Sequence, residues 1–163
     1  MLVAISIYSQ DEYKYQEVVD VPNQTPNEIF INLQTAINLV YNSAPDVIQF
    51  EDKDAGKIIG KALFHYKGPD KYIYTGSEGN VTYTFLFDVK EGKYRMTVEN
   101  IKQEGPFGTF TNSERFEGRY KGWGDAKKQT VYQNYKESVI NYLTDLGQSI
   151  KSKVVKVEND SNW

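Results

Sequence analysis

The stretch from Val81 to Ile101 constrains the fold of this chain more than any other. Two runs in which apolar and polar residues alternate, 81–90 and 93–101, are separated by Glu91-Gly92. Successive side chains of a β-strand point to opposite faces, so two such runs joined by two residues predict a β-hairpin. Gly92 can adopt the positive φ that a turn of this length requires.

The two runs also predict their own register. If Lys90 faces Lys93, the apolar residues meet on one face and the polar residues meet on the other. A shift by one residue would exchange the two faces, so the pattern specifies a single pairing. The predicted apolar pairs are Val89–Tyr94, Phe87–Met96 and Phe85–Val98, and the predicted outer pairs are Asp88–Arg95, Leu86–Thr97 and Thr84–Glu99.

The rest of the chain predicts further strands, with one helix near each end. Thr25, Pro26 and Glu28 form a capping box that opens a helix ending around 41–43. Strands are expected at 15–21, 46–51, 57–67 and, as an edge strand, 111–116; a last helix is expected at 126–150, capped by Asp125 and loosened or ended at Gly147. Strands linked by short turns, with helices at the ends, favour an α+β fold of two layers. We expect a curved antiparallel sheet of about five strands with two helices on one face.

The length of 163 residues favours one domain, which we place at 11–155, followed by a flexible tail at 156–163. Residues 1–10 contain a short apolar run that ends in small and polar residues. Two interpretations stay open for this run: the remnant of a truncated signal peptide, or an apolar first strand.

The composition limits the classes of function. There are 19 basic and 22 acidic residues, which give a net charge of −3, and there is no cysteine. The acidic balance disfavours nucleic acid as a partner, and the lack of cysteine removes thiolate metal sites and cysteine nucleophiles. No run is long enough to span a bilayer, so we expect no transmembrane segment; we also expect a monomer.

Two motifs resemble a known family. They are Glu51-Asp-Lys-Asp-Ala-Gly-Lys-Ile-Ile-Gly-Lys-Ala and Tyr83-Thr-Phe-Leu-Phe-Asp-Val-Lys-Glu-Gly-Lys-Tyr-Arg-Met. Together they resemble a bacterial domain of unknown function that is described as having a TATA-box-binding-protein-like (TBP-like) fold, over residues 13–103. The resemblance implies that fold, and it implies export to the periplasm or cell envelope, with a cytoplasmic location as the alternative. It transfers no activity and no site residue.

The segment 103–125 contains the candidate binding residues. Aromatic and basic side chains are interleaved there between glycines, and such side chains suit sugars, planar ligands or anionic groups. An alternative interpretation is that the aromatic rings pack under the edge of the sheet and the segment only covers it. The candidate residues are Phe110, Arg115, Arg119, Tyr120 and Trp123.

No catalytic residue, metal ligand or cofactor is predicted. His65 is the only histidine and lies on the polar face of a predicted strand, and the turn at Asp52–Gly56 lacks the downstream glutamate of a calcium loop. The main hypothesis is a non-catalytic, exported binding domain for a ligand, a glycan or a protein partner. The alternatives are a hydrolase that uses carboxylates and, by fold analogy only, a nucleic-acid-binding protein.

Overall fold

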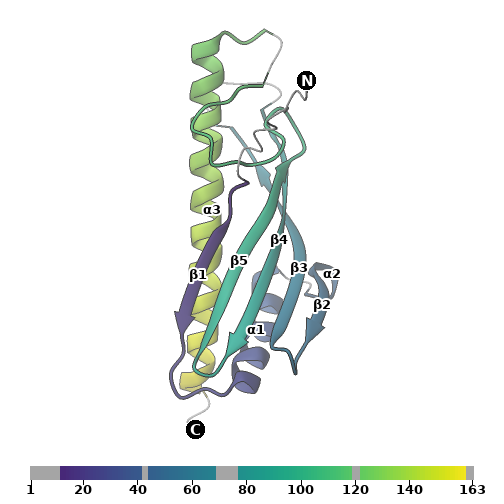
Figure 1. The fold of residues 1–163 in the computed structure, drawn as a ribbon, viewed down its shortest axis with the longest axis vertical. Coiled ribbons are helices and arrows are strands. Elements are labelled where there is room, and N and C mark those ends of the chain that lie inside the picture. Colours follow the sequence, from purple (N-terminus) through teal and green to yellow (C-terminus); the bar gives the residue numbers. More distant parts are fainter. Residues whose placement is uncertain (1–11, 42–43, 69–76, 119–121, 161–163) are drawn as a thin grey trace, which may run out of the picture.

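The computed structural model describes residues 12–41, 44–68, 77–118 and 122–160. Its five strands form one antiparallel sheet in the order β1-β5-β4-β3-β2, with the helices behind it (Figure 1). This arrangement confirms the predicted two-layer α+β fold. In chain order the elements are β1 (Tyr15–Asp20), α1 (Pro26–Tyr41), α2 (Ala44–Val47), β2 (Ile48–Asp52), β3 (Lys57–Tyr66), β4 (Gly79–Lys90), β5 (Lys93–Gln103) and α3 (Asp125–Asp160).

The hairpin of β4 and β5 has the predicted register. Lys90 pairs with Lys93, Val89 with Tyr94, and the alternation continues through Phe85 and Val98. Gly92 has a φ of 66°, as the two-residue turn requires. The hairpin is the centre of the sheet because β3 adds to β4 on one side and β1 adds to β5 on the other.

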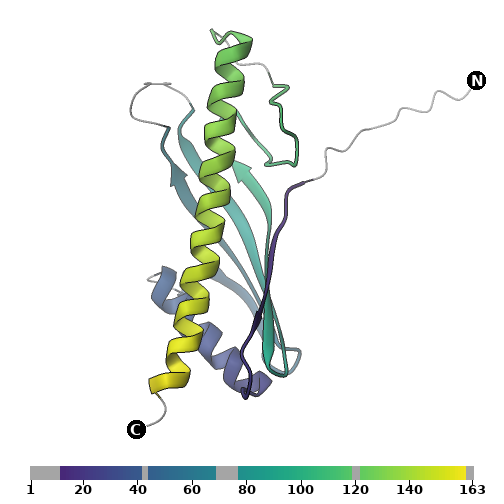
Figure 2. The ribbon, with the colours of Figure 1, turned by 90° about the vertical axis from the view of Figure 1, so that its left-hand side faces the viewer.

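The two long helices cover one face of the sheet and enclose the core. α1 begins at the predicted capping box, in which the Thr25 backbone N–H donates to the Glu28 carboxylate at 2.7 Å. α3 runs along the length of the sheet, and α1 packs beside its C-terminal half (Figure 2). The core between the layers includes Ile29, Leu33, Ile37, Ile58, Phe85, Phe87, Val98, Val139, Leu143 and Ile150.

The strand predicted at 46–51 is wrong in its first two residues. Residues 44–47 form the short helix α2, and the strand β2 starts only at Ile48. Pro45 fits the first turn of a helix, where its missing N–H costs no hydrogen bond. Gly60 of β3 makes room for α2, since a Cβ at this position would lie 2.6 Å from the Val47 carbonyl oxygen.

The last helix begins at Asp125 and continues to Asp160, ten residues beyond its predicted end. Asp125 does not act as the predicted cap: the Gly124 carbonyl accepts the first backbone hydrogen bond, from the Lys128 N–H. Gly147 does not end the helix either. A Cβ there would lie 2.5 Å from the Tyr15 hydroxyl, so this glycine lets β1 approach α3 closely.

The edge strand predicted at 111–116 is also wrong. The segment 104–118, which we call the strap, makes only isolated bridges, at Thr109 and Thr111. Gln129 of α3 accepts from the Phe116 N–H at 3.0 Å and donates to the Phe116 carbonyl at 2.9 Å. These side-chain bonds replace the ladder that a strand would need.

Candidate functional site

One half of β3 has no neighbouring strand on its outer side. β2 pairs with β3 only from Lys57 to Gly60, whereas β4 pairs with β3 along its whole length to Tyr66. Within the described ranges, residues 61–66 are therefore a free edge of the sheet. A row of unpaired backbone N–H and C=O groups is a template for another extended chain.

A cleft of about 580 Å³ borders this free edge and extends over β4 to Asn100 of β5, and we call it the edge cleft. Its lining comes from both sides of the sheet. Tyr41, Asp46 and Val47 come from the helix side, while Lys61 and Leu63 come from the open face. A molecule bound here would lie against the edge of β3 and contact both layers.

Three tyrosine hydroxyls form a hydrogen-bonded chain at the helix side of the edge cleft. The Tyr83 hydroxyl lies 3.0 Å from that of Tyr41 and 2.9 Å from that of Tyr142. Tyr83 is 2% exposed, whereas the other two are half-buried. The chain therefore joins α1, β4 and α3 through the interface between the layers.

Neighbouring rings hold the outer two tyrosines in place. Tyr41 stacks on Phe85 at a centroid distance of 5.5 Å, and Tyr142 stacks on Phe64 at 3.9 Å. The positions of the hydroxyl groups are thus fixed by packing on aromatic rings.

Burial raises the pKa of Tyr41, Tyr83 and Tyr142 above the usual tyrosine value. All three hydroxyls are therefore neutral near pH 7, and they serve as donors and acceptors rather than as bases. Three hydroxyls that share two hydrogen bonds leave one proton to donate elsewhere. Tyr41 and Tyr83 line the edge cleft, so these hydrogen-bonded tyrosines can offer a ligand either a donor or an acceptor.

A second groove, of about 620 Å³, lies between α1 and β2. Ile31 and Phe50 are exposed there, at 46% and 49%. Most of its polar side chains are already bound: Gln34 donates to Glu51 at 2.8 Å, and Thr35 and Asn38 donate to backbone carbonyls of α1. The edge cleft is the stronger candidate because the backbone groups on the outer side of residues 61–66 pair with no strand in the described part of the chain.

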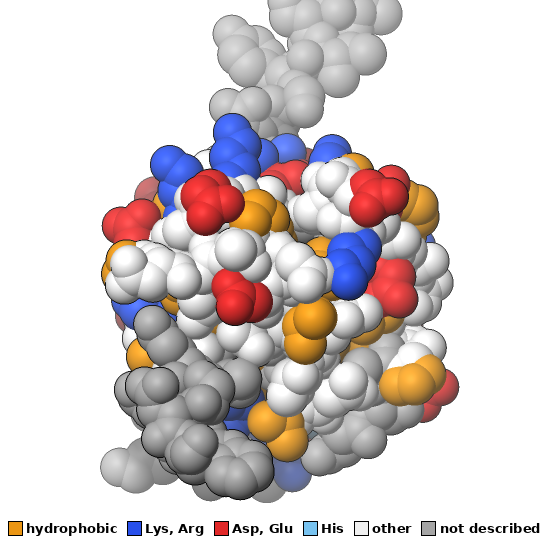
Figure 3. Space-filling view, turned by 90° about the horizontal axis from the view of Figure 1, so that it is seen from below, with side chains coloured by type: hydrophobic (Ala, Val, Ile, Leu, Met, Phe, Trp, Pro, Cys, Tyr) orange, Lys and Arg blue, Asp and Glu red, His pale blue; other side chains and the backbone are white. Residues whose placement is uncertain are grey.

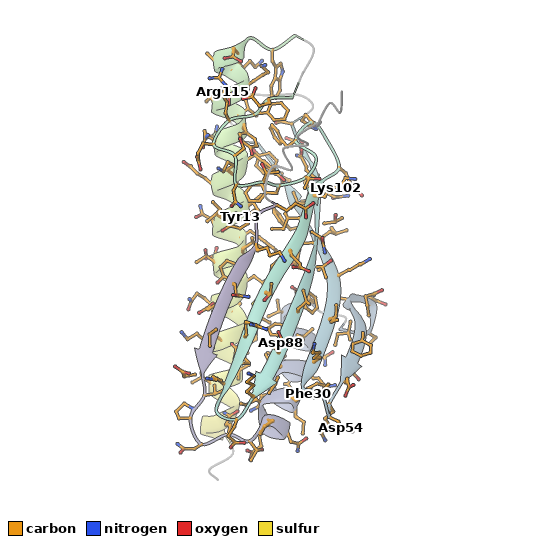
Figure 4. The ribbon with its side chains drawn as sticks, viewed as in Figure 1. Tyr13, Phe30, Asp54, Asp88, Lys102 and Arg115 are labelled. Atoms are coloured by element: carbon orange, nitrogen blue, oxygen red, sulfur yellow. The ribbon has the colours of Figure 1, made fainter. Side chains whose placement is uncertain are left out.

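The open face of the sheet carries charges of both signs. Asp88 binds Arg95 at 2.7 Å and lies 3.9 Å from Lys57, and Lys14 binds Glu99 at 2.7 Å. Asp88 is labelled on this face in Figure 4. The end of the molecule that carries the β4–β5 turn likewise shows interspersed acidic, basic and apolar side chains (Figure 3). Alternating charges of this kind do not provide the continuous positive surface that favours a phosphate backbone.

The structure separates the binding residues predicted in the segment 103–125. Phe110 is 1% exposed and packs edge-on against Tyr13, with ring centroids 5.0 Å apart. Arg115 is exposed at the upper end of α3 (Figure 4) and binds Asp125 at 2.8 Å. Trp123 is half-buried against the core, with the Lys127 ammonium 5.3 Å from its ring.

The other two candidates, Arg119 and Tyr120, lie outside the described residues. Phe110, Arg115 and Trp123 do not line the edge cleft. The aromatic rings of the strap pack instead on those of α3: Phe107 stacks on Tyr135 at 4.6 Å, and Phe116 lies over Tyr132 at 5.5 Å.

The edge cleft was not predicted from the sequence, although two signals for it are present there. Tyr41, Tyr83 and Tyr142 all stand on core-facing positions where phenylalanine would suffice, and a buried hydroxyl needs a partner. Pro45 also limits how far the strand before Asp52 can extend along its longer neighbour.

The profile of the domain of unknown function DUF4468, described as having a TBP-like fold, matches residues 15–104. The chain belongs to this family. A DUF4468 family protein from Bacteroides ovatus ATCC 8483 has a similar crystal structure, with a TM-score of 0.62, 14% identity and coverage of 88% of this chain and 86% of that chain.

A TBP-like protein from Parabacteroides distasonis ATCC 8503 is also similar, with a TM-score of 0.57 and 12% identity. The match covers 86% of this DUF4468 chain and 93% of that protein. At these identities the likeness concerns the fold. No curated protein matches the sequence significantly. No helix in the described part of the chain combines the length and hydropathy needed to cross a membrane.

Proposed function

We propose that this DUF4468 chain is a non-catalytic binding domain and that the edge cleft is its binding site. The observation that carries the proposal is that residues 61–66 of β3 have no pairing strand among the described residues and border a cleft lined in part by Tyr41 and Tyr83. Unpaired backbone groups and neutral hydroxyls together supply hydrogen bonds on two sides of one bound molecule.

The chemistry of the edge cleft favours binding over catalysis. Asp46 is the one carboxylate among the lining residues that the structure describes, and a hydrolase that uses carboxylates needs two. The described residues contain no group of three or more His, Cys, Asp or Glu side chains that could hold a metal ion. The hydrolase alternative therefore gains no support from this site.

Export to the periplasm or cell envelope is part of the proposal. It rests on the apolar run in residues 1–10, which lie outside the described residues, and on the resemblance noted above. Sequencing the N-terminus of the protein recovered from each cell fraction, after expression from the full native gene, tests this part separately. Recovery in the cytoplasm with Met1 retained would overturn it.

The binding proposal can be tested by NMR. The ¹⁵N-labelled chain is titrated with two probe sets, linear neutral tetrasaccharides and uncharged heptapeptides. We expect amide shifts from at least one set to concentrate at 46–47, 61–63 and 82–84. Tyr41→Phe should weaken the binding that causes these shifts.

Arg115→Ala is the matched control, since Arg115 lies at the upper end of α3 and does not line the edge cleft. It should leave the shifts unchanged. Shifts confined to the strap, or shifts that Arg115→Ala abolishes, would contradict the assignment of the site.

A further inference from the structure

The backbone groups that β3 presents outward can be assigned residue by residue. The Gly56 carbonyl accepts from the Val89 N–H at 2.8 Å, so it points towards β4. The N–H of the next residue, Lys57, then points to the opposite side. In an antiparallel pair this direction alternates, and the register between β3 and β4 has no shift from Lys57 to Tyr66.

The odd-numbered residues of β3 therefore direct both their N–H and their C=O groups away from β4. For residues 57 and 59 these groups meet β2. For Lys61, Leu63 and His65 they point to the free edge. A new strand would find three residues in the geometry of a β-ladder, with no rearrangement of the sheet.

The side chains at this edge indicate the chemistry of the strand that would fit. Lys57 at the lower end has an acidic neighbour on β4, since it lies opposite Asp88 at 3.9 Å. Lys61 lies opposite Thr84 instead, and Leu63, which is 56% exposed, lies opposite Thr82. No ion pair involves Lys61 within the part of the chain that the structure describes. A complementary strand would bring an acidic side chain to Lys61 and an apolar one to Leu63.

The alternate positions of such a strand would face the helix layer. Ala62 is small and half-buried there, and Tyr41 and Val47 line the same side of the edge cleft. Apolar side chains of moderate size, such as valine, would fill this side. The bulge of β2 opposite residues 59–60 and the end of α2 at Val47 limit the new pairing to residues beyond Gly60.

We propose that the edge cleft binds an extended segment of a partner protein, which adds to β3 as a sixth, antiparallel strand. Its recognition pattern is an apolar residue opposite Leu63, an acidic residue two positions later opposite Lys61, and a valine-like residue on each side of the apolar one. This inference rests on the proposed function and narrows it to one class of ligand. The mode is β-strand addition, in which backbone bonds supply affinity and alternate side chains supply specificity.

The test uses the full chain and the acetylated, amidated heptapeptide Ser-Thr-Val-Leu-Val-Glu-Ser. Its Thr, Leu and Glu are placed opposite His65, Leu63 and Lys61. Methylation of the Leu nitrogen removes an N–H that faces β3, whereas methylation of the second Val nitrogen removes one that faces away. Binding is measured by calorimetry and by ¹⁵N shifts. We expect the first methylation to weaken binding about fivefold or more and the second to have little effect.

Two changes in the protein complete the design. Leu63→Pro removes one outward N–H and no bond to β4, so it should weaken binding by about fivefold, while Leu63→Ala reports the side chain alone. Lys61→Glu should weaken binding of this peptide about threefold and should improve binding of the version in which Lys replaces Glu.

Each outcome decides between named alternatives. Equal binding of both methylated peptides would overturn strand addition even if the peptide binds. No peptide binding at millimolar concentration would overturn the peptide inference, and tetrasaccharide shifts at residues 61–63 would then preserve the wider binding proposal. A dimer in sedimentation that Leu63→Pro dissociates would identify a second copy of this chain as the occupant and would also overturn the inference.

Discussion

The hydrogen bonds among the hydroxyls of Tyr41, Tyr83 and Tyr142 predict that the stability of the protein depends on which of the three hydroxyls remain. Tyr41→Phe and Tyr142→Phe each remove one hydrogen bond and keep the ring that stacks on Phe85 or Phe64. Each should lower the free energy of unfolding by about 1 kcal/mol. Tyr83→Phe removes both bonds and should cost about 2 kcal/mol.

The double variant Tyr41→Phe/Tyr142→Phe should be the least stable of the series. It leaves the Tyr83 hydroxyl, on a side chain only 2% exposed, with neither of its partners. A buried hydroxyl without a hydrogen-bond partner costs about 1–3 kcal/mol in addition to the two lost bonds. The total loss in the free energy of unfolding is therefore about 4 kcal/mol. Adding Tyr83→Phe removes this unpartnered hydroxyl, so the triple variant should be about 2 kcal/mol more stable than the double variant.

Urea denaturation followed by far-UV circular dichroism measures these free energies, with the slope m compared across the series to confirm a common transition. The decisive comparison is between the double and the triple variant, because adding up the losses of the single variants would rank the triple as the less stable of the two. A triple variant that is less stable than the double, or strictly additive losses, would refute the role of Tyr83 as the centre of the chain.

Three further predictions follow from single contacts. Gly60→Ala places a Cβ 2.1 Å from the Phe85 ring and should cost about 3 kcal/mol in urea denaturation, whereas Gly124→Ala, whose Cβ would meet no atom within 4 Å, should cost no more than the roughly 1 kcal/mol of a less favourable N-cap residue. Gln129→Ala breaks both bonds to Phe116 and should cost about 2 kcal/mol and speed proteolytic cleavage in the strap; an uncleaved strap would contradict its anchoring. Hydrogen bonds from Thr25 hold the pKa of Glu28 below its ordinary value of 4.5, so the stability that this carboxylate contributes is present at pH 7 and is lost as the pH falls through the lowered pKa. Glu28→Gln should therefore flatten the acid limb of the stability profile, and an unchanged limb would argue against the capping box.

The central hairpin and α1 could be predicted from the sequence because their signals are local and agree with one another. The alternation around Phe85 and Phe87 fixes both faces of the hairpin, and Thr25 with Glu28 fixes the start of α1. Local pattern and tertiary packing require the same structure in these elements, so nothing overrides the prediction.

The wrong predictions concern places where contacts distant in sequence decide the structure. A glycine inside a helix normally lowers the stability of the helix by about 1 kcal/mol. α3 nevertheless continues through Gly147, because Tyr15 of β1 packs against this glycine. The strap fails to form a strand because Gln129 takes the hydrogen bonds of Phe116. Neither partner can be recognised before the fold is known.

The candidate site depends on distant contacts even more strongly. Tyr41, Tyr83 and Tyr142 come together only when α1 and α3 pack on β4. The free edge exists because α2 ends the pairing of β2 with β3 at Gly60. Both α2 and β2 are too short for hydrophobic periodicity to reveal their boundaries in the sequence.

Amide hydrogen exchange along β3 in the ligand-free protein tests the central claim most directly. Ala62 and Phe64 direct their N–H groups to β4 and should be strongly protected, whereas Lys61, Leu63 and His65 direct theirs to the free edge and should exchange much faster. Residues 57 and 59, which pair with β2, should be protected and serve as the internal control. Protection of residues 61, 63 and 65 equal to that of 62 and 64 would show that this edge is already covered and would contradict the proposed binding site.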